Sequence, residues 1–369
     1  MPETLEPKAE PEAVRVRTFD WLRGGAAILM IQHHAEDLLR PGLRRGAGYD
    51  LLDRVDGLVA PAFLLTAGFA LGLTQVRAGG DLGRAGRSFR RSAEVLLAAT
   101  FVNWMWFPVF REPHWLWRID ILHCIGLSLL LLLPLAVWGA HRPRSLTLGA
   151  GGLGLLAFVA APFAERVRGP LAPFVNVESG AVFPLLPWFG YLAFGLVLGG
   201  AAARSRRALR HTLLALGALG IAVYLGRPLW LAWLPAHDFW RTDPSTHGDR
   251  WALVCGLALG LLAVETRWPA ARGPRLLALF SGFSLSAYVL HEALLYHQVF
   301  GFSFQSRFGE RCGWGDYWLL TAALAALTLA GCVAIDRGAD VFRTILRALC
   351  AGRARSSLPS PTVSPKEPP

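Results

Sequence analysis

The sequence predicts an all-α, polytopic integral membrane protein. Of its 369 residues, 53% are hydrophobic and only 17% are charged, which is less charge than a soluble domain of this length carries. Apolar segments long enough for a helix to cross a bilayer recur along the whole chain. We therefore expect about ten transmembrane helices, near residues 19–39, 57–76, 92–110, 119–139, 145–164, 181–203, 208–226, 249–266, 276–299 and 317–336.

The apolar segments form a single predicted domain, residues 15–350, because no linker or shift in composition divides them. Residues 1–14 are polar and Pro-rich and lack the apolar core of a signal peptide. Residues 351–369 are rich in Ser and Pro. We expect a disordered tail at each end.

The distribution of basic residues predicts cytoplasmic N- and C-termini. With ten spans and the N-terminus inside, most of the 37 Lys and Arg residues fall in inner segments. The formal net charge of +11 fits loops that face anionic lipid and requires no nucleic-acid partner. We expect a multi-pass protein of the bacterial inner (plasma) membrane. The five cysteines lack metal-ligand spacing, so no metal is predicted.

The first apolar segment carries ionisable groups near both of its ends. Arg23 and His34 are eleven residues apart, about 16 Å of helical rise and close to three turns, so they share one face. Intramembrane charges face a bundle interior and mark functional sites. Asp20 lies within reach of Arg23, and His33 is expected to pair with Asp37 at i+4.

Other segments place polar side chains at the same outer level as His34. In the predicted topology they include Asp56, Asp120, His123 and His291, from three further segments. Each costs a few kcal/mol in lipid unless it is paired or hydrated, which predicts a common site. Glu292 is expected to point away from the helical stripe that carries His291.

Five segments resemble known transmembrane acyltransferases. The motifs are LRGGAAILMIQHH (22–34), DGLVAPAFLLTAGFALGL (56–73), RIDILHCIGLSLLLL (118–132), FPLLPWFGYLAFGLVLG (183–199) and FSLSAYVLHEALLY (283–296). In this order they resemble the heparan-alpha-glucosaminide N-acetyltransferase catalytic-domain family, which is related to acyltransferase family 3. The resemblance covers roughly residues 15–300.

The resemblance implies transfer of an acyl group, usually acetyl from cytosolic acetyl-CoA, to a sugar amine or hydroxyl at the outer face. His34 occupies the motif histidine and Arg23 the motif arginine, whereas His123 stands where the family has glutamine. Acyl transfer needs a base that removes the acceptor's proton, and histidine suits this role. We therefore predict His34 as the base and Asp56 as the acid that orients it.

The remaining predicted roles concern the two substrates. On the cytoplasmic side, Arg23 with Asp20 would meet acyl-CoA, since the Arg guanidinium binds phosphate well. On the acceptor side we predict His291, His123 and Tyr288. Each group also has a plain structural reading, as a hydrogen-bonded core histidine or as an internal Asp20–Arg23 pair. Direct transfer and a route through an acyl-histidine are both open.

A proton-coupled transporter or flippase is the main alternative, because intramembrane His, Asp and Arg also form proton relays. Transporters of the common type show two related halves, and residues 1–180 and 181–369 show no convincing repeat. A non-catalytic scaffold gives no reason for ionisable groups to gather at one depth. The predicted partners are the lipid bilayer and a glycan or other small acceptor.

Overall fold

The computed structural model describes residues 16–107, 110–177, 180–268, 273–297 and 301–356, and within these ranges its regular elements are all helical. The predicted tail 1–14 and residues 357–369 lie outside the described residues. In chain order the longer helices are α1 (Arg17–His34), α2 (Ala47–Asp56), α3 (Val59–Arg77), α4 (Leu82–Trp106), α5 (Ile121–Trp138), α6 (Pro143–Ala164), α8 (Leu185–Arg204), α9 (Arg206–Leu225), α11 (Pro244–Arg267), α12 (Arg275–Gly282), α13 (Ser284–Tyr296) and α15 (Trp314–Ser356).

Short helices connect these long ones. They are η1 (Ala35–Leu38), η2 (Pro41–Leu43), η3 (Pro113–Trp117), α7 (Ala172–Val175), α10 (Arg227–Leu231) and α14 (Phe304–Phe308).

All ten predicted transmembrane segments fall on helices of the structure. Among the described residues, seven helices are long and apolar enough to cross a membrane, and the bent pair α12–α13 raises the number to eight. Helices α1 and α4 are not among them, because charged residues interrupt α1 and the first half of α4. The structure supports a multi-pass membrane protein, but it does not confirm the predicted number of ten spans.

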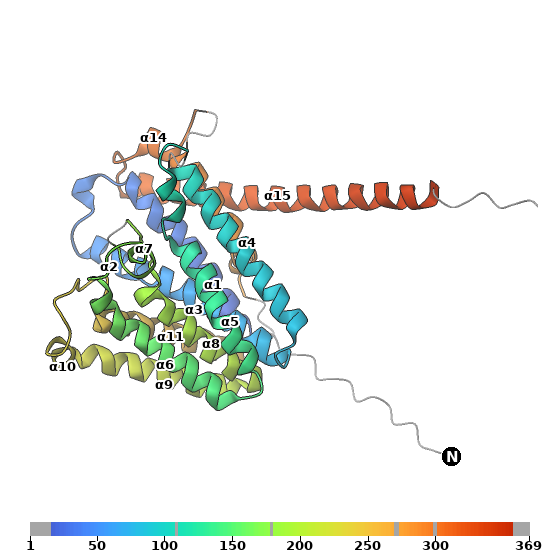
Figure 1. The fold of residues 1–369 in the computed structure, drawn as a ribbon. Helices are drawn as coiled ribbons and strands as arrows, with labels where there is room; N and C mark the ends of the chain where they lie inside the picture. Colours follow the sequence, from blue (N-terminus) through green and yellow to red (C-terminus); the bar gives the residue numbers. More distant parts are fainter. Residues whose placement is uncertain (1–15, 108–109, 178–179, 269–272, 298–300, 357–369) are drawn as a thin grey trace, which may run out of the picture.

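The centre of the bundle is the contact between α3 and α8, where glycines let the two backbones approach closely (Figure 1). A Cβ atom added at Gly68 would lie 2.0 Å from the backbone oxygen of Leu192, and one at Gly195 would lie 2.1 Å from that of Leu65. Small residues at such positions are typical of close helix packing in membranes.

Helix α1 contacts α3, α11, α12 and α13, and its first turn is held by an acid from α11. The Glu265 carboxylate accepts hydrogen bonds from the backbone N–H groups of Arg17 (3.1 Å) and Thr18 (2.9 Å) and pairs with Arg206 (2.8 Å). The N-terminal ends of α1 and α9 and the C-terminal end of α11 therefore meet, as the predicted up-and-down order requires.

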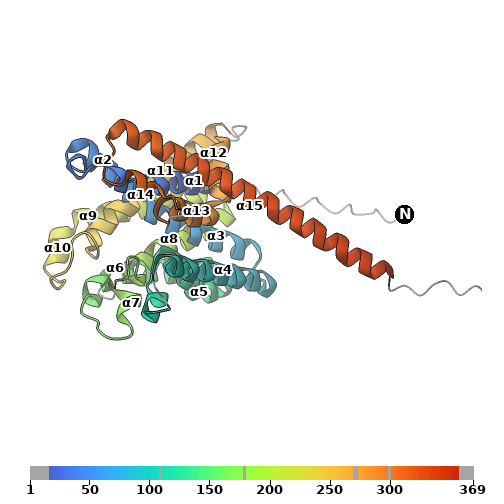
Figure 2. The same ribbon diagram turned by 90° about the horizontal axis from the view of Figure 1, so that it is seen from above.

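Two helices depart from a simple bundle. The ninth predicted segment is broken, because α12 and α13 meet at 85°. Helix α15 has 43 residues, and its second half extends past the other helices in both views (Figures 1 and 2). The break at α12–α13 decides which side chains of α13 face α1.

Candidate active site

One large cavity of about 1310 Å³ lies where α1, α2, α4, α11 and α13 present their outer ends, in the sense of the predicted topology. It brings together polar side chains that are far apart in the sequence. The polar and aromatic side chains that line it include His33, His34, Asp56, Trp106, Asp120, Tyr288 and Glu292. Its lining, mostly apolar and aromatic with a few placed polar groups, is typical of a small-molecule site.

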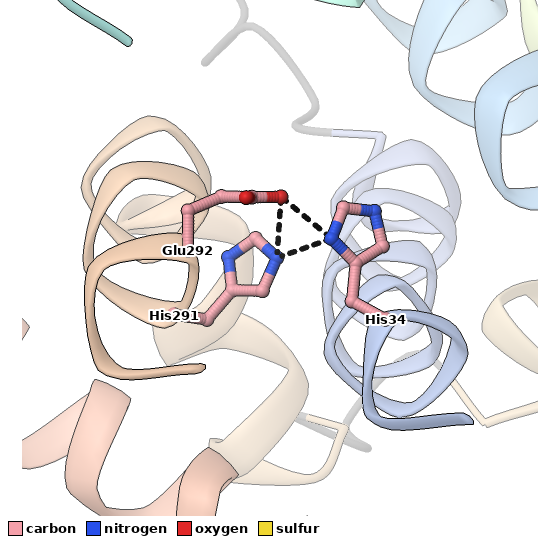
Figure 3. Close-up of side chains that lie close together, drawn as sticks. All are labelled: His34, His291 and Glu292. Carbon is pink, nitrogen blue, oxygen red and sulfur yellow. Dashed lines mark hydrogen bonds and ion pairs between the residues drawn. The ribbon is translucent and has the colours of Figure 1, made fainter. Parts of the chain in front are cut away.

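His34 is the centre of a compact group with His291 and Glu292 of α13 (Figure 3). The Nδ1 atom of His34 lies 2.5 Å from Oε1 of Glu292 and 3.3 Å from Nε2 of His291. The side chain of His34 is 27% exposed, whereas those of Glu292 and His291 are buried. His34 and Glu292 therefore both line the cavity, His34 being the more exposed, and His291 lies behind them.

The hydrogen-bond partners assign the proton positions in this group. Nδ1 of His291 lies 2.8 Å from the backbone oxygen of Ala287, which can only accept, so this nitrogen carries the proton. In neutral His291, Nε2 is then an acceptor, and the Glu292 carboxylate also only accepts. The proton between His34 and an ionised Glu292 therefore belongs to Nδ1 of His34, and in the neutral imidazole Nε2 then carries a lone pair.

Glu292 is fixed from its other side by the end of α4. The indole Nε1 of Trp106 donates to Oε2 of Glu292 at 3.1 Å, and the Trp106 ring packs against Tyr296. The Tyr296 hydroxyl donates to Asp37 at 2.8 Å. Each oxygen of the Glu292 carboxylate thus has its own donor, which suits a buried acid that holds an imidazole.

The predicted pairing of His34 with Asp56 is wrong, and so is the expectation that Glu292 points away. Asp56 accepts from Gln32 at 3.1 Å and lies 3.6 Å from Nδ1 of His33. His33 pairs with Asp56 and Glu36 rather than with Asp37. The reason is geometric, because adjacent residues on a helix project about 100° apart, so His33 and His34 face different neighbours.

The structure separates the predicted substrate residues into two sets. Tyr288 lines the cavity and donates to Asp120 at 3.3 Å. His291 is fully buried against His34, and His123 is buried in α5 with no partner for its Nδ1 among the described residues. Neither His291 nor His123 belongs to the cavity lining.

Arg23 and Asp20 lie near the other end of α1. They pair with each other at 3.5 Å, and Nε of Arg23 donates to Ser281 of α12 at 3.0 Å. Neither residue belongs to the cavity lining, whose deepest α1 residue is Met30. About 10 Å of helical rise separates Met30 from Arg23.

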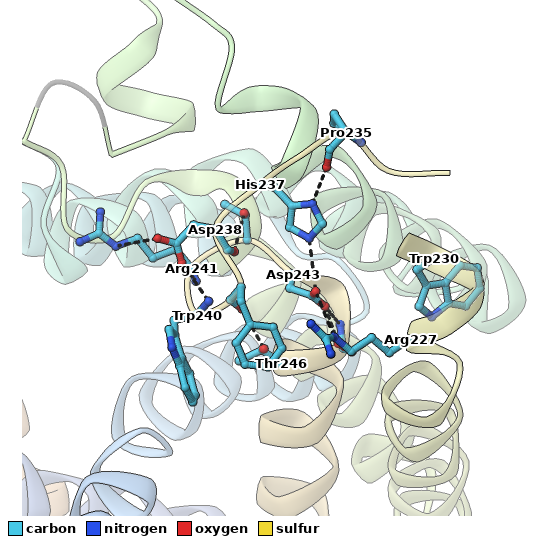
Figure 4. Close-up of polar contacts among 12 residues, drawn as sticks. Arg227, Trp230, Pro235, His237, Asp238, Trp240, Arg241, Asp243 and Thr246 are labelled. Carbon is cyan, nitrogen blue, oxygen red and sulfur yellow. Dashed lines mark hydrogen bonds and ion pairs between the residues drawn. The ribbon is translucent and has the colours of Figure 1, made fainter. Parts of the chain in front are cut away.

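The loop before α11, whose polar contacts are drawn in Figure 4, contributes residues to the cavity lining and is called the rim loop. Asp238 accepts from the backbone N–H groups of Trp240 and Arg241, and both of these residues line the cavity. Asp243 caps α11 through Ser245 and lies 3.3 Å from Nε2 of His237. Burial raises the pKa of Asp243, but the hydrogen bonds from Ser245 and His237 outweigh it and hold this pKa below its usual value.

Two groups at the cavity have the donor atoms of a metal site. His34, His291 and Glu292 form one, and His33, Glu36 and Asp56 form the other. In each group the ligand atoms lie within 4.8 Å of one another. The first is a two-histidine, one-carboxylate set of the kind that zinc enzymes use, but here its short His34–Glu292 contact is a hydrogen bond.

Sequence reasoning missed Glu292, Glu36 and Trp106. One available signal was the position of Glu292 inside an apolar segment beside a motif histidine, where an acid is costly unless it is paired. Glu36 follows the two histidines and falls within reach of His33 at i+3. Trp106 carried no such signal, because tryptophans at the ends of membrane helices are common.

The geometry agrees with the comparison to known families. The profile of the family described as "Heparan-alpha-glucosaminide N-acetyltransferase, catalytic" matches residues 15–235, more than half of the chain. No curated protein matches the chain. The family match includes His34 and Asp56, whereas His291 and Glu292 lie beyond its end. The chain belongs to the heparan-alpha-glucosaminide N-acetyltransferase catalytic-domain family and is a multi-pass membrane enzyme of the acetyltransferase type.

Proposed function

We propose that this enzyme transfers an acyl group from cytosolic acyl-CoA to an amine or hydroxyl of a glycan or similar small acceptor at the outer side. Acetyl is the acyl group that we propose first. His34 is the general base. The observation that carries this assignment is the 2.5 Å contact between His34 and Glu292 at the wall of the cavity.

In the proposed reaction, Nε2 of His34 removes the acceptor's proton while the acceptor atom attacks the thioester carbonyl. Glu292 holds the imidazole by its Nδ1–H and stabilises the imidazolium that forms, as the acid does in a Ser-His-Asp triad. His291 supports this arrangement from behind. Its role is positioning, because it contacts His34 and does not line the cavity.

The cavity lining supports a sugar acceptor. The rings of Trp106, Trp188 and Trp240 offer flat apolar surfaces, and Asp120 with Tyr288 offers hydrogen-bonding groups. A few polar groups among aromatic side chains are typical of sites that bind and orient small ligands. The family name points to an amino sugar, so a glucosaminide is the first acceptor to test.

The donor side rests on Arg23 and Asp20. They lie toward the end of α1 that the positive-inside rule places in the cytoplasm. Bound acyl-CoA would meet Arg23 with its phosphates while its pantetheine arm follows α1 toward His34. This path is part of the proposal, since the cavity itself reaches only to Met30.

The test is thioester cleavage by the purified full-length protein in detergent. Acetyl-CoA is supplied with methyl α-glucosaminide or a panel of other sugars, and release of CoA is measured for wild type, His34→Ala and His211→Ala. His211 is an exposed histidine of α9 that does not line the cavity. We expect acceptor-dependent CoA release by wild type and His211→Ala, and a loss of at least about 10²-fold in His34→Ala.

Other outcomes would contradict the proposal in distinct ways. CoA release that survives in His34→Ala would remove His34 from the reaction and leave the enzyme. A wild-type protein that cleaves no thioester but moves a solute across vesicle membranes would establish a transporter instead. A stable acetyl adduct on His34 before acceptor is added would make His34 a nucleophile rather than a base.

A further inference from the structure

The same cavity contains a second histidine with its own acids. His33 immediately precedes His34 in the chain. Its Nδ1 lies 3.6 Å from Asp56 and 3.9 Å from Glu36. The rings of His33 and His34 are 5.8 Å apart between centroids and inclined at 67°. The proposed role of His34 involves neither His33 nor its two acids.

Both acids beside His33 are buried and held in place. The Asp56 side chain is 0% exposed and accepts from Gln32, and Glu36 accepts from the Tyr49 hydroxyl at 2.9 Å. Two carboxylates beside one imidazole favour its protonated form, because opposite charges at this range stabilise each other. His33 therefore favours the imidazolium form, with a proton on both ring nitrogens, whereas the proposed base His34 acts with no proton on Nε2.

The other charged groups around this part of the cavity come from α2 and α11. Asp50, Asp53 and Arg54 of α2 line it, as do Asp249 and Arg250 of α11. Arg54 is paired with Asp249 at 3.3 Å. These groups leave Asp56 and Glu36 as the acids in direct contact with the His33 ring.

His33 reaches the cavity with a partly exposed ring. Its side chain is 46% exposed and lines the cavity, while its Nδ1 lies toward the carboxylates. Nε2, the other ring nitrogen, makes neither of these contacts. Two histidine rings at this separation can flank one tetrahedral carbon, with one ring on the attacking atom and the other on the leaving atom.

We propose that His33 is the general acid of the acyl transfer and protonates the leaving sulfur of acyl-CoA. The inference rests on the proposed function, since it assigns the second proton transfer of the same reaction. A thiolate with a pKa of about 8.5 is a fair leaving group, so an acid should contribute toward the low end of the usual range, about 10²-fold.

The proposed step balances. The acceptor's N–H or O–H bond breaks and its proton goes to Nε2 of His34, while the acceptor atom forms a bond to the carbonyl carbon. The carbon–sulfur bond then breaks, its electron pair goes to sulfur, and the proton on Nε2 of His33 moves to that sulfur. The products are the acylated acceptor and free CoA thiol. A proton passes from His34 to His33 through water and restores both groups.

The experiment compares wild type with His33→Gln, because the Gln amide can still donate to Asp56 but cannot transfer a proton. His211→Gln is the matched control. With acetyl-CoA we expect kcat to fall about 10²-fold in His33→Gln while KM stays within a few-fold. We also expect the wild-type rate to fall toward alkaline pH, as His33 loses its proton, and the variant to lack this fall.

A second donor separates chemistry from structure. With the acetyl thioester of thionitrobenzoate, whose aryl thiolate leaves without a proton, His33→Gln should approach the wild-type rate, and His34→Ala should remain inactive. If wild type does not accept this donor, the pH profile with acetyl-CoA decides.

Several results would overturn the inference. They are full activity of His33→Gln with acetyl-CoA, an unchanged alkaline fall in the variant, or equal losses with both donors. Activity that disappears with a chelator and returns with zinc in wild type but not in His33→Gln would make the His33 group a metal site instead. A wild-type protein that cleaves no thioester removes the proposed function first, and with it this step, whereas active wild type with unaffected His33→Gln removes only this step.

Discussion

Nδ1 of His34 and Oε1 of Glu292 lie 2.5 Å apart, although they belong to the first long helix and to the broken α12–α13 segment near the end of the chain. The family match ends at residue 235. The proposed base therefore lies inside the matched part and the acid that contacts it lies outside it. Under the proposed mechanism, the enzyme needs α13 to complete its site.

Glu292→Gln should abolish most of the activity without unfolding the protein. The Gln amide can donate to Nδ1 of His34 and so select the tautomer in which Nε2 carries the proton and cannot act as a base. The equivalent change in a Ser-His-Asp triad costs about 10⁴-fold in kcat, and we expect a loss of about 10²- to 10⁴-fold here. Steady-state kinetics with acetyl-CoA measures it, with exposed Glu112→Gln as control. A variant with wild-type kcat would contradict the role of Glu292.

Trp106→Phe should lower kcat about tenfold, because a hydrogen bond to a charged group is worth roughly 1.5–3 kcal/mol and only part of it acts in the transition state. The Phe ring keeps the packing against Tyr296 but removes the donor to Glu292. Trp104→Phe is the control, since Trp104 is half-exposed and contacts Phe101 and Phe110 outside the cavity. Equal effects of the two substitutions would show that the indole N–H does not matter.

Gly68→Ala should destabilise the bundle by about 1–3 kcal/mol, the usual effect of overpacking. Its Cβ would collide with the backbone oxygen of Leu192, so α3 and α8 would have to separate. Gly151→Ala is the matched control in a helix with open space around the new methyl group. Thermal unfolding in detergent measures the difference, and a Tm of Gly68→Ala at or above that of the control would refute the close packing.

Glu265→Ala should lower stability by about 1–2 kcal/mol, comparable to the loss of a helix N-cap. The first N–H groups of α1 would lose their acceptor, and Arg206 would lose its partner. Glu94→Ala removes only an exposed pair with Arg90 and should leave Tm nearly unchanged. Similar Tm values for the two variants would show that the Glu265 contacts contribute little.

Asp243 should make the rim loop sensitive to acid. Because its pKa is lowered in the folded protein, its stabilising contribution is present above the unfolded value of about 3.9 and is lost as pH falls through the lower folded value. The Tm of Asp243→Asn should therefore lie below that of wild type at neutral pH, with a gap that is constant to about pH 5 and narrows below about pH 4. A gap that widens on acidification would reverse the sign and contradict the assignment.

Much of the fold could be predicted from the sequence, because long apolar segments and helical periodicity are local properties. Each predicted segment falls on a helix, and the outer ends that carry His34, Asp56, Asp120 and Glu292 line one cavity. The break between α12 and α13 was not predicted, although Ser281 and Gly282 lie at it, a pair at which helices commonly kink or end. Because the break was not foreseen, the sequence could not show that Glu292 of α13 faces α1.

By itself, the sequence determined an α-helical membrane protein, the family and the position of His34 on the inner face of its first helix. Only the tertiary structure decided which acid serves which histidine: Glu292 contacts His34, and Asp56 with Glu36 contacts His33. Periodicity determines which residues share a face of one helix, but not how neighbouring helices are rotated against it. Those rotations depend on contacts such as the glycines between α3 and α8 and the 85° bend before α13.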